Sequence, residues 1–241
     1  MKRTLLAAAM VAAAPAFAAG EWQFEAMPYL WAAGMKGDVG VKQLTAQGVE
    51  MSFPDIMKSL RAGFMGSLEG RKDEYGFFFD AIYMQLHQKH PATHGFLGDV
   101  DAKPTQQAYA LAGTWRAVTG EQPVDVFLGV RSNYVKVNLD VSPGAVTPGR
   151  TLDASRTWGD GYLGARVKIP MAPRWSFLGY ADIGAGGSDS TWQAMAGIDY
   201  AISPASKASF GYRYFKVDYH KDDFLWNMAT GGPYVGMSLG F

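Results

Sequence analysis

The chain of 241 residues carries 22 basic and 22 acidic side chains, so its formal net charge of zero gives no electrostatic footprint for nucleic acid. It has no cysteine, which excludes disulfides and thiol chemistry. Glycine is frequent, at 29 residues, and aromatic residues make up 14%, while the mean hydropathy of -0.07 suits strands whose polar and apolar faces average out.

Residues 1–19 are expected to be a cleaved signal peptide. A cationic start at Lys2 and Arg3 precedes an apolar run that extends to Ala14, and the small residues up to Ala19 suit cleavage. The run is shorter than the ~20 apolar residues of a transmembrane helix, and no later segment reaches that length. We therefore expect an exported chain with one domain, residues 20–241.

Side chains beyond the leader alternate with a period of two, which predicts strands. The alternation is clearest in the last segment, where Val235, Met237 and Leu239 face away from Gly236 and Ser238. The predicted strands, in chain order, are 22–33, 62–71, 75–86, 106–118, 124–138, 160–169, 175–183, 192–202, 207–220 and 234–241. Short turns alternate with longer connections at about 36–60, 88–104, 141–157 and 222–229, as outer-membrane barrels do. The prediction is an all-β, transmembrane, antiparallel up-and-down barrel of about ten strands with a closed polar interior; eight and twelve strands are the alternatives.

Aromatic residues fall at both ends of these strands, and Trp and Tyr favour the two membrane interfaces. The predicted periplasmic ends carry Trp22, Phe24, Tyr75, Phe77, Trp115, Trp175, Tyr200 and Phe241. The predicted outer ends carry Tyr83, Tyr109, Tyr134, Trp158, Trp192, Tyr214 and Tyr234. Two girdles are therefore expected.

In two strands the apolar side chains switch from one set of alternate positions to the other, at residues 130–135 and 214–215. We call this switch the parity change. A β-bulge would shift the register by one residue. The favoured alternative is that these strands extend above the membrane, where the pattern need not hold.

If the apolar faces point outward, the charged side chains of the strands line the lumen. This lumen charge network comprises Glu25, Glu69, Arg71, Asp80, Arg116, Asp125, Arg131, Asp160, Arg166, Lys168, Asp182, Asp199 and Arg213. Charges in a narrow lumen are costly unless paired, so interlocked ion pairs are expected, and arginine suits bidentate pairing with carboxylates. The favoured interpretation is a polar core that holds the barrel shut. The alternative is a narrow conduit for small solutes, although barrels of about eight strands are filled and open channels need about sixteen.

Three histidines, His87, His90 and His94, lie in one predicted outer loop and raise the possibility of a metal site. Their spacing suits a helix, which Pro91 and Gly95 oppose, so a solvated loop is favoured. We expect no metal and no cofactor.

A second polar group, Asp218, His220, Asp222 and Asp223, lies at the outer end of the ninth strand. Omptin proteases are barrels with acidic residues and a histidine at the outer rim, so a rim hydrolase is an alternative. None of that family's local motifs is present, and no catalytic residue is assigned.

The first long loop contains the segment 53–60, where Ser52 or Asp55 can cap a short helix. Its apolar residues Ile56, Met57 and Leu60 are expected to fold over the barrel mouth or to lie at the outer interface, and a partner-binding surface is one interpretation.

Several motifs in the first third resemble a group of small outer-membrane proteins of proteobacteria: Pro28-Tyr29-Leu30-Trp31 with Gly34 and Gly37, Phe53-Pro54-Asp55-Ile56, and Glu69-Gly70-Arg71 followed by Asp80 and Tyr83. The C-terminal strand ending in Phe241 is similar to the assembly signal of outer-membrane barrels. The resemblance implies location in the bacterial outer membrane, with membrane lipid and the barrel-assembly machinery as partners, and it brings no activity.

The sequence thus favours a structural or interaction-type outer-membrane protein, with the narrow conduit as an option and the rim hydrolase as the alternative. A third class is a soluble periplasmic β-sandwich or lipocalin-like binder, which would bury its apolar strand faces inward.

Overall fold

The computed structural model describes residues 20–41, 47–90, 100–143 and 149–241 of the chain. The predicted signal peptide and His94 lie outside the described residues.

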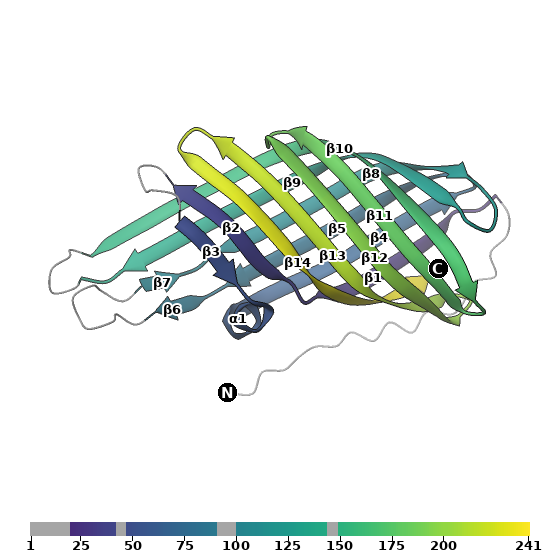
Figure 1. Ribbon diagram of the computed structural model, residues 1–241, viewed down its shortest axis with the longest axis horizontal. Coiled ribbons are helices and arrows are strands. Elements are labelled where there is room, and N and C mark those ends of the chain that lie inside the picture. The colour runs from purple at the N-terminus through teal and green to yellow at the C-terminus, as the bar shows by residue number, and fades with distance from the viewer. Residues whose placement is uncertain (1–19, 42–46, 91–99, 144–148) are drawn as a thin grey trace.

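Ten strands form a closed antiparallel barrel, as the sequence predicted (Figure 1). In their order around the barrel they are β1 (Gln23–Trp31), β4 (Leu60–Lys72), β5 (Tyr75–Leu86), β8 (Thr105–Val118), β9 (Val124–Val141), β10 (Arg150–Ala172), β11 (Trp175–Gly186), β12 (Ser190–Ser203), β13 (Ser206–Lys221) and β14 (Phe224–Gly240). The ring closes because β1 pairs with β14 on one side and with β4 on the other. One end, which we name the turn end, has tight turns such as the one between β4 and β5, where Asp73 has a positive φ of 53°.

The opposite end, the outer end, carries additional elements: β2 (Gly34–Val41), β3 (Gln47–Met51), α1 (Phe53–Ser59), β6 (Gln88–His90) and β7 (Val100–Ala102). β2 follows β1 along the same edge of β14, and β3 pairs with β2 to form a hairpin. β6 pairs with β7, which pairs with β9. In the described part of the chain, no helix is long and apolar enough to cross a membrane.

The strands at the outer end are longer than the sequence predicted, and the loops are correspondingly shorter. β10 begins at Arg150 and β14 at Phe224, within segments expected to be loops, and the segment 36–60 contains two strands and a helix. The registers of β9 with β10 and of β13 with β14 are unbroken, so the bulge interpretation of the parity change is wrong. The parity changes because the inner face itself becomes apolar towards the outer end, where Val135 and Phe215 are buried.

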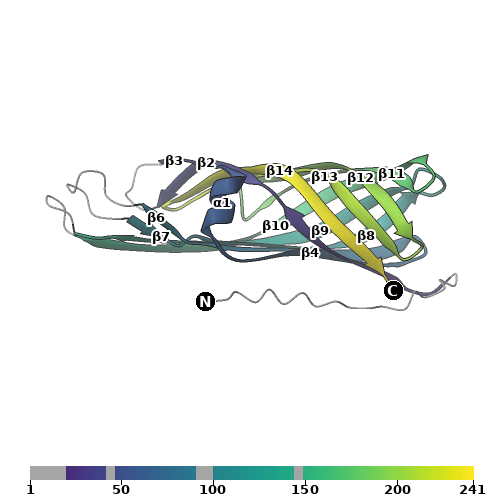
Figure 2. The same cartoon turned by 90° about the horizontal axis from the view of Figure 1, so that it is seen from below.

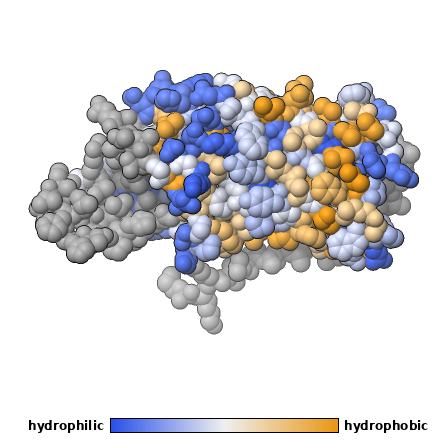
Figure 3. Space-filling model, in the orientation of Figure 1, coloured by the Kyte–Doolittle hydropathy of each residue, from blue (hydrophilic) through white to orange (hydrophobic). Residues whose placement is uncertain are grey.

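The exterior of the barrel is apolar and the interior holds the charges. Leu128, Ile183 and Val130 are 71%, 66% and 61% exposed, whereas Asp199 and Arg213 are buried. The apolar belt consists of Leu30, Phe79, Leu111, Leu128, Val130, Leu163, Ile183, Phe210, Val235 and Met237. Figure 3 shows hydrophobic residues over the barrel and hydrophilic ones around the β2–β3 hairpin. This polarity is the reverse of that of a soluble sandwich or lipocalin-like binder, which would bury these apolar faces.

Most predicted girdle residues lie on the exterior. At the turn end, Phe24 stacks on both Trp22 and Phe241, with ring centroids 6.0 and 5.8 Å away. At the outer end, Trp192 stacks on Tyr214 at 5.0 Å.

Two assignments to the outer girdle are wrong, because Trp158 and Tyr234 are buried in the lumen. They share their parity with Asp160 and Ser238 on the inner face, where Trp158 stacks on Tyr219 at 4.4 Å.

The helix α1 has the capping box that its sequence predicted. The Ser52 amide donates a hydrogen bond to Asp55 Oδ2 over 3.3 Å, and the Ser52 hydroxyl also donates to that oxygen. These two donors hold the pKa of the exposed Asp55 carboxyl below its usual value. Ile56 is buried, whereas Met57 is 43% exposed. The helix therefore turns one apolar side chain inward and one outward.

Substituting a lipid-facing leucine by arginine tests the orientation of the wall. Leu128→Arg places a charge in the middle of the apolar belt, where the expected cost is about 2–4 kcal/mol, against about 0–1 kcal/mol near an interface. Ser132→Arg is the matched control, because Ser132 lies four residues further along the same exposed face and pairs with Tyr109 of the outer girdle. Urea unfolding of protein refolded in vesicles measures the loss of stability in each variant. Equal losses of stability would contradict the assigned belt.

Because Asp55 caps α1, the protection of the α1 amides from hydrogen exchange is expected to depend on pH. A carboxyl whose folded pKa is depressed stabilises the fold above its unfolded pKa, and this contribution is lost as the pH falls through the folded value. Hydrogen exchange of the α1 amides, corrected for intrinsic rates, is expected to show less protection at low pH. Asp55→Asn should abolish that dependence; if the dependence persists in the variant, another group causes it.

Candidate functional site

The lumen contains two layers of ionised side chains that connect opposite walls. In the first, near the turn end, Arg166 of β10 donates from both Nη atoms to the two carboxylate oxygens of Glu69 on β4, each over 2.7 Å. Arg166 Nη2 also donates to Asp125 Oδ2 over 2.8 Å. β4 and β10 lie four places apart in the ring of ten, so this bidentate pair spans the barrel.

Two further arginines complete this turn-end layer. Arg116 Nε lies 2.9 Å from Asp125 Oδ1. Arg71 Nη2 lies 3.0 Å from Glu69 Oε1 and 3.1 Å from Asp125 Oδ2. Three guanidinium groups therefore share two carboxylates, which is the interlocked pairing that charges in a narrow lumen require.

A group of lysines and carboxylates lies beside this layer. Lys207 Nζ lies 2.8 Å from Glu25 Oε1 and 4.0 Å from Asp199 Oδ2, and Lys168 Nζ lies 3.6 Å from the same Asp199 oxygen. The predicted network omitted Lys207, although its parity with Arg213 on β13 places it on the inner face.

The middle layer is built around a second pair that spans the lumen. Arg213 of β13 donates from Nη2 to Asp80 Oδ2 of β5 over 2.9 Å and from Nη1 to the Tyr29 hydroxyl over 2.7 Å. The same hydroxyl donates to Asp80 Oδ1 over 2.7 Å. Tyr29, which lies in the resemblance motif, thus links the arginine to its carboxylate partner.

The middle layer continues through an amide to the far wall. Arg213 Nε donates to Gln193 Oε1 over 2.7 Å, and Gln193 Nε2 donates to Asp182 Oδ2 over 2.9 Å. The same oxygen accepts from Arg131 Nη2 over 2.8 Å and from the Tyr180 hydroxyl over 2.7 Å. Four strands, β9, β11, β12 and β13, are joined by this chain of hydrogen bonds.

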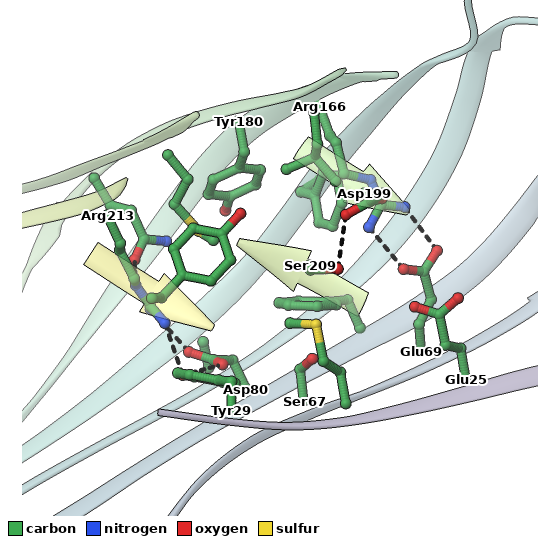
Figure 4. Close-up of a pocket in the computed structure, with 18 of the residues that line it drawn as sticks. Glu25, Tyr29, Ser67, Glu69, Asp80, Arg166, Tyr180, Asp199, Ser209 and Arg213 are labelled. Carbon is green, nitrogen blue, oxygen red and sulfur yellow. Dashed lines mark hydrogen bonds and ion pairs between the residues drawn. The ribbon is translucent and has the colours of Figure 1, made fainter. Parts of the chain in front are cut away.

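A cavity of about 90 Å³ lies between the two layers. In Figure 4, Arg213 with Asp80 lies at one side of it and Arg166 with Glu69 at the other.

Above the middle layer the described part of the lumen becomes mainly apolar, and its buried charges lie in the turn-end and middle layers. The apolar layer contains Trp31, Ile82, Met84, Val135, Trp158, Phe215, Val217, Tyr219, Phe224, Trp226 and Met228, all buried. Guanidinium groups mark the boundary: Arg213 lies 5.0 Å from the centroid of Trp31, and Arg131 lies 5.0 Å from that of Phe215. These cation–π contacts join the charged half to the apolar half.

The structure places all the predicted lumen charges except Asp160 in ion pairs. Asp160 instead accepts a hydrogen bond of 2.7 Å from the Ser188 amide and so fixes the turn between β11 and β12.

The candidate sites at the outer end are not assembled among the described residues. His87 Nε2 lies 3.0 Å from Asp101 Oδ1, but the side chain of His90 and all of His94 lie outside the described part. Within the described ranges, no group of three or more histidine and acidic side chains could hold a metal ion.

The rim group lies at the outer end of β13 and in the turn that follows it. His220 has an exposed side chain, and its backbone amide donates to Asp189 Oδ2 over 3.1 Å. In residues 149–241 and the other described ranges, the imidazole pairs with no carboxylate. Asp222 has a positive φ of 51° and forms part of the turn between β13 and β14.

No protein-family model matches the sequence, and no curated protein does. Solved structures do resemble the fold. The outer membrane protease OmpT from Escherichia coli has a TM-score of 0.58 at 8% identity, covering 92% of this chain and 97% of that one. Ail from Yersinia pestis (TM-score 0.41, 11% identity, 91% and 97% covered) and the transport unit of the autotransporter AIDA-I from Escherichia coli (TM-score 0.44, 8% identity, 91% and 88% covered) are more distant. The chain therefore has the fold of an outer-membrane β-barrel.

Removing one member of the turn-end layer should be costly, and removing its partner as well should add less than that partner's own single substitution costs. Glu69→Ala leaves Arg166 and Arg71 short of a carboxylate, and breaking a buried pair costs about 3–5 kcal/mol. The double substitution Glu69→Met with Arg166→Met is expected to cost less than the sum of the two single ones.

Urea unfolding of the refolded barrel, with heat-modifiable gel mobility as a check on folding, measures these costs. Glu50→Ala is the control, because it breaks the exposed pair with Lys36, whose side chains are 73% and 76% exposed, and such pairs contribute about 0–1 kcal/mol. Strict additivity in the double variant would contradict the coupled layer.

Proposed function

We propose that this protein is a sealed barrel of the bacterial outer membrane that does not conduct and that serves a structural or interaction role at the cell surface. The observation that carries this proposal is the filling of the lumen: two ion pairs span it, Arg166 with Glu69 and Arg213 with Asp80, and an apolar layer lies above them. A solute moving along the axis would have to separate both pairs and then pass through packed aromatic rings.

The same features argue against the narrow conduit and against an enzyme. The cavity between the layers holds about 90 Å³ and is bounded by paired charges. A hydrolase at the rim needs an acid–base pair in hydrogen-bond contact, and His220 does not provide one with the described carboxylates. The likeness to OmpT concerns the fold, at 8% identity, and brings no proteolytic role to this chain.

The outer end provides the surface for such an interaction role. β9 with 18 residues and β10 with 23 continue as a ribbon beyond the apolar belt, beside the β2–β3 hairpin and the β6–β7 pair. Lys36 and Glu50, on β2 and β3, are highly exposed and pair with each other. In this proposal the belt is held by membrane lipid, and β14, which ends beside Phe241, is the strand that the assembly machinery recognises.

Single-channel recording of the refolded protein in planar bilayers tests the proposal. We expect no discrete current steps, because two ion pairs and the apolar layer lie across the described part of the lumen. A sixteen-stranded porin in the same bilayer is the control for detection, since barrels of about that size hold an aqueous channel. Reproducible steps from the wild-type protein, changed in size by Arg166→Ala, would show that the lumen conducts and would overturn the proposal.

A further inference from the structure

The wall of the barrel has a seam in its outer half, between β1–β2 and β4. The register of β1 with β4 ends at the pair Pro28–Gly66. Beyond this point the chain continues as β2, which pairs with β14 and β3, while residues 60–65 of β4 pair with β5. Figure 2 shows α1 lying across the gap between β2 and β4. A helix, rather than strand pairing, therefore closes this part of the wall.

A pocket of about 120 Å³ lies beneath α1 at this seam. Its inner wall includes Ile82, Met84 and Phe215, which are buried in the apolar layer of the lumen. Its mouth includes Leu30 and Phe64, which are 48% and 60% exposed on the exterior. The pocket thus connects the outside of the barrel with its apolar interior.

The mouth lies at the level of the apolar belt. Leu30 pairs with Val235, which pairs with Phe210 on the next strand, and both partners are belt residues. Phe64 lies opposite Tyr83, which belongs to the outer girdle. In the orientation proposed above, the mouth therefore faces the hydrocarbon of the outer leaflet, just below its interface.

The lining of the pocket is suited to a hydrocarbon. It contains no charged side chain among the described residues, and four methionines, Met35, Met57, Met65 and Met84, contribute to it. Methionine side chains adapt to irregular apolar shapes. Apolar cavities of about 150 Å³ stay dry and take up molecules the size of benzene, so this one has room for the end of an alkyl chain.

We infer that this seam pocket binds the end of an acyl chain of an outer-leaflet lipid, which enters between Leu30 and Phe64 beneath α1. The inference rests on the proposed membrane orientation. It goes beyond that proposal by assigning a specific lipid-binding site to the barrel wall. The occupant is a lipid chain rather than a protein partner, because the mouth opens within the belt that hydrocarbon covers.

Photolabelling of the full-length refolded protein tests this site. The probe is a phosphatidylcholine with a diazirine at the terminal carbon of one acyl chain, mixed into phosphatidylcholine vesicles, and labelled residues are mapped by mass spectrometry. We expect label on inner-wall residues such as Met84 and Phe215 in addition to belt residues such as Leu128. A probe with the diazirine next to the headgroup should label the exterior but not Met84 or Phe215.

Two substitutions on β8 make the test specific. Ala108→Phe adds a ring to the lining of the pocket, where Ala108 is 8% exposed, and should reduce inner-wall labelling severalfold. Leu111→Phe adds a ring on the outward face of the same strand and should leave that labelling unchanged.

The outcomes separate this inference from the proposed function. If belt residues are labelled but Met84 and Phe215 are not, or if Ala108→Phe leaves their labelling intact, the pocket does not take a lipid chain. If a single-chain fatty alcohol with the same diazirine labels the inner wall but the phospholipid does not, the assignment to membrane lipid is overturned. If belt residues are not labelled either, the membrane orientation itself is wrong. Should Ala108→Phe fail to fold, the comparison of the two diazirine positions on wild-type protein still tests whether an acyl chain enters the pocket.

Discussion

The bidentate pair between Arg166 and Glu69 illustrates the constraint on which the rest of this structure depends. An ionised group inside a ring of ten strands can be solvated neither by hydrocarbon outside nor by bulk water within, so it must find an opposite charge across the lumen. Such pairing fixes which face of each strand points inward. A register slip of one residue would exchange the two faces of a strand and carry its charge into the belt. The charges therefore specify the arrangement of the strands as well as filling the space between them.

Along the barrel axis the inner side chains change from charged to apolar, and this change accounts for the length of the strands. In the turn-end half, arginines pair with carboxylates across the lumen, while the outer half is packed mainly with aromatic and aliphatic side chains. The strands can extend past the belt because this apolar layer gives them a core of their own, as in a small water-soluble sheet. Arg131 and Arg213, each against an aromatic ring, lie where the two halves meet.

The seam opens where β1 parts from β4 while remaining beside β14. Pro28 is the last residue of β1 paired with β4, whereas the pairing with β14 continues to Trp31. Near the break between β1 and β2, Gly232 of β14 approaches the Ala32 carbonyl so closely that a Cβ atom would lie 2.2 Å from that oxygen. The chain is thus drawn to β14 and away from β4, and α1 covers the opening that results.

The sequence by itself determined the period-two strands, the outward belt, the turn-end girdle, the cap of α1 and most of the inner charges, because each depends on side chains that are neighbours along one strand. It did not determine which carboxylate each arginine meets: Arg166 and Glu69 are 97 residues apart, and only the closed ring brings them together. Nor could it locate the seam, although the parity of Trp158 with Asp160 and of Tyr234 with Ser238 does place both rings on the inner face. Those outcomes depend on which strands face one another across the barrel, a relation that exists only once the sheet has closed.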